Sequence, residues 1–310
     1  TETNVPHAEN ISYFGDGDEA HVIYNFPLPP LILHALYSGN GSYLRSWAEG
    51  LETQPAPPGC TYLNFTASHD GVGLRPLEGL VPKPEVDDLL EGMRARGGYI
   101  SSKRNSDGSD SPYELNISYF DAFRPANPRD SRWHIPAFLA SQALSLSFQG
   151  IPAVYIHCLT ATPNDNLGVE RTGMTRSINR RKWDLSELED LIDDPASETA
   201  QVFGALRQLL VTRRGQPAFQ VFTVGQGFGQ PRRLGPFARL DQMLDPPGEF
   251  EKFFQFRHGS RPQRAAARVS AGACPPIADQ ASRIWPSRAA DSWMASASLL
   301  ALARVSRRTR

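Results

Sequence analysis

Polar and charged side chains that could do chemistry gather just after the ends of predicted strands. His69 and Asp70 directly follow a strand expected over residues 60–65. The aspartate can accept hydrogen bonds and stabilise positive charge, and the adjacent histidine can donate a hydrogen bond. Taken alone, however, an aspartate in front of Gly71 more often closes a turn through its own side chain.

Glu2 supplies a second carboxylate, and three arginines follow the last predicted strand. A carboxylic acid can give up a proton and later take one back, which is general acid and base chemistry. Arg171 and Arg176 could bind an anion through paired N–H groups, and Arg180 could bind a hydroxyl and brace a carboxylate. The alternative for each is plain: a carboxylate near a chain end and a surface arginine are usually just solvated.

Three strand-then-helix units are expected to position these side chains. Apolar and β-branched runs predict strands, and apolar residues at helical spacing predict helices. The expected strands cover residues 21–26, 60–65 and 151–156, and the expected helices cover 29–38, 43–51, 84–96, 133–148 and 196–212, with a polar loop over 101–111. This order predicts an α/β fold with parallel strands, in which the polar residues at the strand ends suit a β/α barrel or a doubly wound sheet equally well.

The composition excludes several classes of protein. The chain has 310 residues, 40% of them hydrophobic and 21% charged, which is typical of a globular protein and not of a disordered or fibrous one. No apolar run approaches the roughly 18 residues of a membrane span, and no leader or phosphate-binding glycine loop is visible. Cys60, Cys158 and Cys274 have neither disulfide nor metal-ligand spacing, so we expect reduced thiols, no metal and a cytoplasmic protein.

The charge is divided unequally along the chain. Residues 1–225 hold 18 Lys and Arg against 27 Asp and Glu, whereas residues 226–310 hold 14 against 6. The last segment also loses its apolar periodicity, so we expect residues 221–310 to be divergent, basic and poorly ordered. One interpretation is a tail that binds nucleic acid or an acidic partner; the one we prefer is a non-native terminus produced by a shifted reading frame.

Four segments together resemble one known family. They are residues 1–7 (TETNVPH), 66–73 (TASHDGVG), 150–155 (GIPAVY) and 176–180 (RSINR). Their order and content resemble the α-amylase superfamily of glycoside-active barrels, and within it the sucrose-phosphorylase-like subfamily. The residues around Glu2 are most similar to the members that act on glucosylglycerate. The resemblance implies that residues 1–220 form the C-terminal part of a (β/α)8 barrel, comprising strands 5 to 8.

The resemblance also implies an activity and a set of roles. It implies a retaining α-glucoside phosphorylase that needs no cofactor, takes inorganic phosphate as co-substrate and binds a small glucoside, with no nucleic acid or membrane partner. Glu2 would be the general acid/base, while Asp70 and His69 would grip the sugar at the cleavage site. Arg180 would reach the same sugar, and the remaining candidates are Tyr113 and Glu114 near the departing group and Arg171 and Arg176 for phosphate or the carboxylate of glycerate.

Other functions stay open at this point. A hydrolase or transglucosidase of the same superfamily would use water or a second sugar in place of phosphate. A non-catalytic sugar-binding remnant would keep His69 and Asp70 without turnover. The nucleophile of the family is an aspartate on the fourth strand, for which these residues offer no match, so we expect the 310-residue chain alone to be inactive.

Overall fold

The computed structural model describes residues 1–216 and residue 219. The strands are β1 (Val22–Tyr24), β2 (Thr61–Asn64), β3 (Val72–Gly73), β4 (Tyr99–Arg104), β5 (Asp110–Asn116) and β6 (Ile151–Pro152). The helices are α1 (His7–Ser12), α2 (Leu28–Ser38), α3 (Ser42–Thr53), α4 (Lys83–Arg94), α5 (His134–Ser147), α6 (Ile156–Leu159), α7 (Asn166–Thr172), α8 (Leu185–Asp193) and α9 (Glu198–Gly215), with 3₁₀ turns η1 (Arg75–Leu77), η2 (Asp121–Phe123), η3 (Pro128–Trp133) and η4 (Thr175–Asn179). The predictions made for residues 221–310, and for Cys274, fall outside the described residues.

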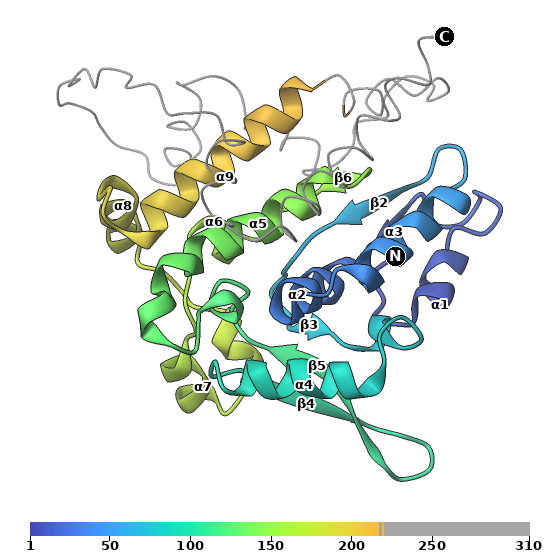
Figure 1. The fold of residues 1–310 in the computed structure, drawn as a ribbon, viewed down its shortest axis with the longest axis horizontal. Coiled ribbons are helices and arrows are strands. Elements are labelled where there is room, and N and C mark those ends of the chain that lie inside the picture. Colours follow the sequence, from blue (N-terminus) through green and yellow to red (C-terminus); the bar gives the residue numbers. More distant parts are fainter. Residues whose placement is uncertain (217–218, 220–310) are drawn as a thin grey trace. The chain divides into compact units, whose positions relative to one another are not determined.

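The parallel strands β1, β2 and β6 form the sheet that the strand-then-helix order predicts. β2 lies between the other two, and both pairings are parallel. Helices α2 and α3 connect β1 to β2, as a parallel crossover requires (Figure 1). The described residues thus form a mixed α/β structure with an open sheet of three parallel strands rather than a closed ring.

Thr1 extends this sheet on the outer side of β1. Its nitrogen donates to the Val22 carbonyl at 2.8 Å, and the Tyr24 nitrogen donates to the Thr1 carbonyl at 3.1 Å. These are the two hydrogen bonds of a parallel bridge opposite Ile23. Glu2 therefore follows a residue that pairs with β1, at the same edge of the sheet where β1 and β2 end.

Helix α2 is the central helix beside this sheet. Pro29 and Pro30 occupy its first turn, where a missing N–H costs nothing, and Gly39 ends it with a φ of 71°. Leu28, Leu31, Ile32 and Leu33 are all at most 1% exposed. A helix that is apolar on several faces must be covered on several faces, and α2 contacts α3, α4 and α5.

The prediction of a polar loop over residues 101–111 is wrong. β4 and β5 form an antiparallel hairpin there, with Tyr99 opposite Asn116 and Arg104 opposite Asp110, and the short strand β3 joins the other side of β5. Most side chains of β4 are exposed, so its sequence shows none of the apolar alternation from which strands are predicted. Figure 1 shows the hairpin as a long two-stranded ribbon.

The position predicted for the third parallel strand is correct, but its predicted length is wrong. β6 has two residues instead of the six expected, and the chain turns into α6 at Ile156. Ile151 is 47% exposed, although its apolar sequence is typical of a strand covered on both faces. Within the described residues β6 pairs only with β2, so it is an edge strand and its apolar sequence overstated its burial.

Helices α5 and α9 pack side by side (Figure 1). Buried residues Phe138 on α5 and Val202 and Leu206 on α9 belong to the largest apolar cluster. Buried His134, at the start of α5, contacts the Phe120 carbonyl at 2.8 Å and Glu198 at 3.3 Å.

Near the other end of α9, Arg213 donates to three carbonyls, one in the last turn of α5 and two in the segment that leads to β6. They belong to Leu146, Phe148 (3.2 Å) and Gly150 (2.9 Å). Burial lowers the pKa of Arg213 to about 10. No helix in the described part of the chain has the length and apolar character of a membrane span.

Candidate active site

A cavity of about 290 Å³ opens where the parallel strands end. It is lined by Glu2, Asn4, Phe26, Ser68, His69, Asp70, Gly71, Gly73, Tyr113, Glu114 and Arg176. Six of the eight site residues predicted from the sequence are in this set. The structure therefore brings Glu2 and Asp70 to one cavity, although they are far apart in the sequence.

The sheet accounts for the position of both carboxylates. Glu2 follows the parallel bridge of Thr1, and Ser68 to Gly71 follow β2 after three intervening residues. Between the strands, buried Asn25 donates to the Asn64 side chain at 2.8 Å, and Asn64 donates to the Gln149 carbonyl at 3.0 Å. These bonds tie the ends of β1, β2 and the segment before β6 together, so the loops above them start from fixed points.

Two arginines hold Asp70. Its Oδ1 atom lies 2.8 Å from Nη2 of Arg180 and 2.8 Å from Nη1 of Arg176. Arg180 also donates from Nε to the carbonyl of His69 at 2.7 Å. The carboxylate is about one third exposed, so it is fixed in orientation and still reachable from the cavity.

Glu114 is paired with Arg176 in a two-point ion pair. Arg176 donates from Nε and Nη2 to the two carboxylate oxygens, both at 2.9 Å, and only 5% of the Glu114 side chain is exposed. The hydrogen bond to Glu114 is the largest contribution that raises the pKa of Arg176. All three guanidinium nitrogens of Arg176 thus contact a carboxylate of Glu114 or Asp70.

Glu2 and His69 are the more exposed groups of the cavity. Glu2 is exposed, and its charge adds to the effect of burial in raising the pKa of Tyr24. The His69 side chain is 65% exposed, with Nε2 at 3.8 Å from Asp70 Oδ1. An accessible carboxylic acid can exchange a proton with a ligand, and an exposed imidazole beside it can donate a hydrogen bond.

Gly71 brings the Asp70 loop close to the hairpin. A Cβ at this position would lie 2.5 Å from the Leu115 carbonyl oxygen and 2.6 Å from Cγ of Glu114. Only glycine therefore fits, and the close approach is what puts Asp70 beside the Arg176–Glu114 pair.

Two of the predicted residues do not line the cavity. Arg180 lies outside the set of lining residues and donates hydrogen bonds to Asp70 and to the carbonyl of His69. Arg171 is exposed on α7 and away from these contacts. Tyr113 lines the cavity, and its carbonyl accepts from Asn4 at 3.3 Å and from the Leu74 nitrogen at 3.0 Å.

Sequence reasoning missed Asn4 and Asn179. Asn179 is buried and donates to the carbonyls of Ser68 at 2.6 Å and Asp70 at 3.3 Å, so it holds the loop that carries Asp70. The segment 176–180 was noticed for its last arginine, and nothing in the spacing marks the asparagine. Within the described residues, no three His, Cys, Asp or Glu side chains come together as a metal site would require.

The chain was compared with known proteins by sequence and by structure. No family model matches the chain. The chain is 43% identical over 220 residues to a glucosylglycerate phosphorylase of Escherichia coli (strain K12), covering 71% of this chain and 39% of the relative. It is 45% identical over 219 residues to a glucosylglycerate phosphorylase of Spirochaeta thermophila, covering 71% and 37%.

A solved structure shows the same fold. The crystal structure of sucrose 6F-phosphate phosphorylase from Thermoanaerobacter thermosaccharolyticum superimposes with a TM-score of 0.57 at 24% identity, over 71% of this chain and 41% of that one. The predicted resemblance to sucrose-phosphorylase-like proteins is confirmed. The chain spans about two fifths of the length of the curated relatives it matches.

Proposed function

We propose that this chain, which is 43–45% identical to glucosylglycerate phosphorylases over 71% of its length, serves the phosphorolysis of an α-glucoside. The reaction transfers a glucosyl group to inorganic phosphate with retention of configuration. The substrate is glucosylglycerate, sucrose or a close relative. The observation that carries the proposal is that Glu2, Asp70 and Arg176 line one cavity.

Glu2 is the general acid and base in this proposal. Breaking a glycosidic bond with retention needs an acid to protonate the departing oxygen, and the same group then takes a proton from the incoming nucleophile. The exposure of Glu2 suits a group that must exchange protons with two ligands in turn.

Asp70 and His69 hold the sugar in this proposal, and Arg180 positions both of them. The Asp70 carboxylate accepts hydrogen bonds from ring hydroxyls and stabilises the positive charge that develops on the ring. Arg180 fixes both the Asp70 carboxylate and the His69 carbonyl, so it orients the pair without lining the cavity. His69 is exposed and can donate to a neighbouring hydroxyl.

Arg176 binds phosphate or the carboxylate of glycerate. Its Nη1 and Nη2 atoms each use one hydrogen bond, and each carries a second N–H that can be donated to an anion. Tyr113 lies next to it at the acceptor side of the cavity. Glu114 is occupied by Arg176, so its role is to fix the arginine, and the exposed Arg171 has no contact that supports the role predicted for it.

The proposed reaction needs only the glucoside and phosphate, with no cofactor, nucleic acid or membrane. Cys60 and Cys158 are free and buried, which fits a reducing compartment such as the cytoplasm.

The first test is binding of glucose 1-phosphate, the product of the proposed reaction, measured by calorimetry on the 310-residue chain. We expect saturable binding that D70N weakens about tenfold or more, since it removes a carboxylate held on the sugar. R171Q is the matched control and should change the affinity less than about twofold, because Arg171 lies outside the cavity. Absence of binding, or equal loss in the two variants, contradicts the proposal.

The second test separates phosphorolysis from the alternatives. The complete coding sequence is expressed and supplied with glucosylglycerate or sucrose in phosphate buffer, and the products are identified. Glucose 1-phosphate supports the proposal. Free glucose indicates a hydrolase, a longer saccharide indicates a transglucosidase, and saturable sugar binding without turnover indicates a non-catalytic remnant.

A further inference from the structure

Phe26 is the residue of the candidate active site whose side chain is bulky and wholly apolar. Of the eleven residues described around the cavity of about 290 Å³, two are glycines and eight carry a hydroxyl, amide, imidazole, guanidinium or carboxylate group. Phe26 is neither fully buried nor fully exposed, and it lines the cavity. The roles proposed above leave this ring without a function.

The sheet places Phe26 between the two carboxylates that are proposed to act on the substrate. β1 has the bridge of Thr1 on one side and β2 on the other, and Phe26 is the second residue after β1. Three neighbouring segments thus bring Glu2, Phe26 and Asp70, in this order, to the same cavity. A glycosidic bond that both carboxylates reach therefore lies beside the Phe26 ring.

Contacts with two other aromatic rings hold the Phe26 side chain. Its ring stacks on Tyr24 with centroids 5.9 Å apart and meets Phe65 edge-on at 5.4 Å. The Phe26 nitrogen donates to the Tyr24 carbonyl at 2.9 Å, and the buried Pro27 restricts the backbone in front of it. Because the ring is fixed before a ligand arrives, little side-chain freedom is lost on binding.

An apolar ring in a polar cavity suits the C–H surface of a sugar. The hydroxyls of a glucosyl ring are equatorial, so both faces of the ring present C–H groups. The polar side chains of the cavity can bond to the hydroxyls, whereas an aromatic ring packs against the C–H groups and removes them from water. Inorganic phosphate has no such surface and gains nothing from Phe26.

We propose that Phe26 is a specificity-determining residue of this site, and that its ring packs against the C–H face of the glucosyl group held by Asp70. The inference rests on the proposed function, since the glucosyl group is what that reaction transfers. The contact itself requires neither phosphate nor turnover.

The direct test is NMR of the 310-residue chain, deuterated except for its phenylalanine rings, with glucose and with glucose 1-phosphate. F26A identifies the ring signals of Phe26 by their loss. We expect nuclear Overhauser effects between these ring protons and the C–H protons of both bound sugars. Because this measurement uses the unaltered chain, it does not depend on how well a variant folds. Overhauser effects to other rings only, or no binding of either sugar, overturn the proposal.

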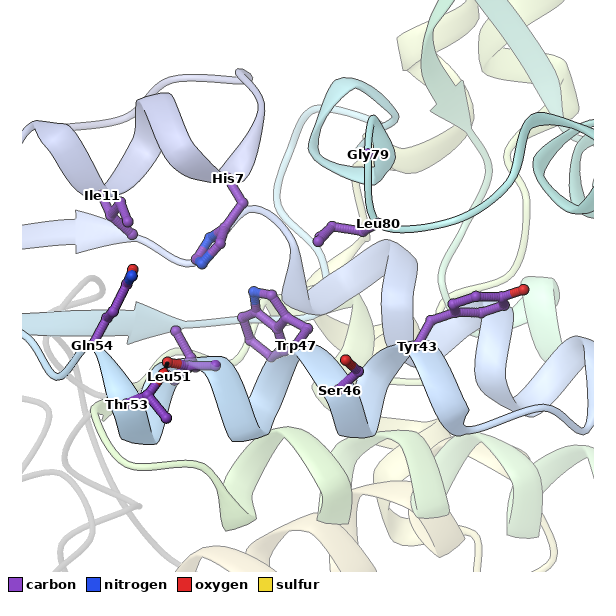
Figure 2. Close-up of a pocket in the computed structure, with 11 residues that line it drawn as sticks. His7, Ile11, Tyr43, Ser46, Trp47, Leu51, Thr53, Gln54, Gly79 and Leu80 are labelled. Carbon is purple, nitrogen blue, oxygen red and sulfur yellow. Dashed lines mark hydrogen bonds between the residues drawn. The ribbon is translucent and has the colours of Figure 1, made fainter.

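Titration of the variants measures how much the ring contributes. F26A should weaken binding of glucose and of glucose 1-phosphate about tenfold or more, and leave binding of inorganic phosphate within about twofold. Y43A is the matched control, because Tyr43 lines a different cavity, beside α3, that shares no lining residue with the candidate active site (Figure 2). It should change all three affinities less than about twofold. Unchanged sugar binding in F26A, or an equal loss in F26A and Y43A, overturns the proposal.

This inference and the proposed function can fail separately. Binding of glucose 1-phosphate that D70N weakens and F26A does not would remove the role of Phe26 and leave phosphorolysis standing. Sugar binding that depends on Phe26, with free glucose as the product of the complete coding sequence, would support the contact and contradict phosphorolysis.

Discussion

Removing Arg176 should destabilise the fold far more than removing another arginine from an ion pair. The Glu114 side chain is 5% exposed and receives two hydrogen bonds at 2.9 Å from Arg176. R176A would leave that carboxylate buried without its partner, and breaking a buried pair on one side costs about 3 kcal/mol or more. For a folded unit of this size, this corresponds to a fall in Tm of roughly 6–12 °C.

Urea unfolding gives the free energy, and a double-mutant cycle with E114Q isolates the pair. Because the amide introduced by E114Q carries no charge, R176A should cost much less in that background, with a coupling energy of about 2 kcal/mol. R104A is the matched control: Arg104 pairs with Asp110 at 3.4 Å with both side chains more than half exposed, so its loss should cost less than about 0.5 kcal/mol. If R176A and R104A cost the same, or if the coupling is near zero, Glu114 is not held by Arg176 as described.

Three further outcomes follow from other contacts. The hydrogen bond from His134 is the main cause of the lowered pKa of Glu198. The ionised carboxylate therefore stabilises the fold above its ordinary pKa of 4.5, and this effect is lost as pH falls through the lower pKa of the folded state. In urea unfolding, E198Q should lower the free energy of unfolding at pH 7 and approach the wild type near pH 3. G71A should cost about 1–3 kcal/mol because its Cβ would contact the Leu115 oxygen. Gly204 lies at an exposed position of α9 where a Cβ meets nothing, so G204A should stabilise the fold by roughly 0.5–1 kcal/mol, and equal effects of the two substitutions would contradict this. Burial raises the pKa of Cys158 to about 12, so a thiol reagent at pH 8 should label it only on unfolding, as peptide mass spectrometry can check.

The helices and parallel strands could be predicted from the sequence because the apolar residues of each segment follow the spacing of a single kind of secondary structure. The apolar runs of β1 and β2 and the proline-to-glycine span of α2 carry their own start and stop signals, and all three lie where expected. The hairpin of β4 and β5 could not be predicted in this way. The side chains of β4 are largely exposed, and those of β5 are buried only from Glu114 to Asn116, so the hairpin is determined by pairing between two backbones, which leaves no periodic trace.

The site could be predicted only in part. The end of the strand expected over residues 60–65 pointed to His69 and Asp70, since loops after parallel strands converge on one edge of a sheet. Glu2 could be predicted only from the resemblance of residues 1–7 to a known family. The pairing of Glu114 with Arg176 could not be predicted, because it joins a hairpin strand to a loop 62 residues further on. Asn4 and Asn179, which support the site, could not be predicted from one sequence, because nothing in the sequence distinguishes an asparagine that holds a loop from any other polar residue.

The guanidinium of Arg213 links the end of α9 to the end of α5 and to the segment that leads to β6. By donating to carbonyls of Leu146, Phe148 and Gly150, it fastens the last long helix to the turn that leads into the edge strand, and it stacks on Phe219 at 4.0 Å. A shortened protein that ends at Phe219 keeps the hydrogen bonds of Arg213. One that ends a few residues before Arg213 removes this donor from the three backbone carbonyls. The smallest version worth producing is therefore set by a side chain near the end of α9, and not by the last residue of the apolar core.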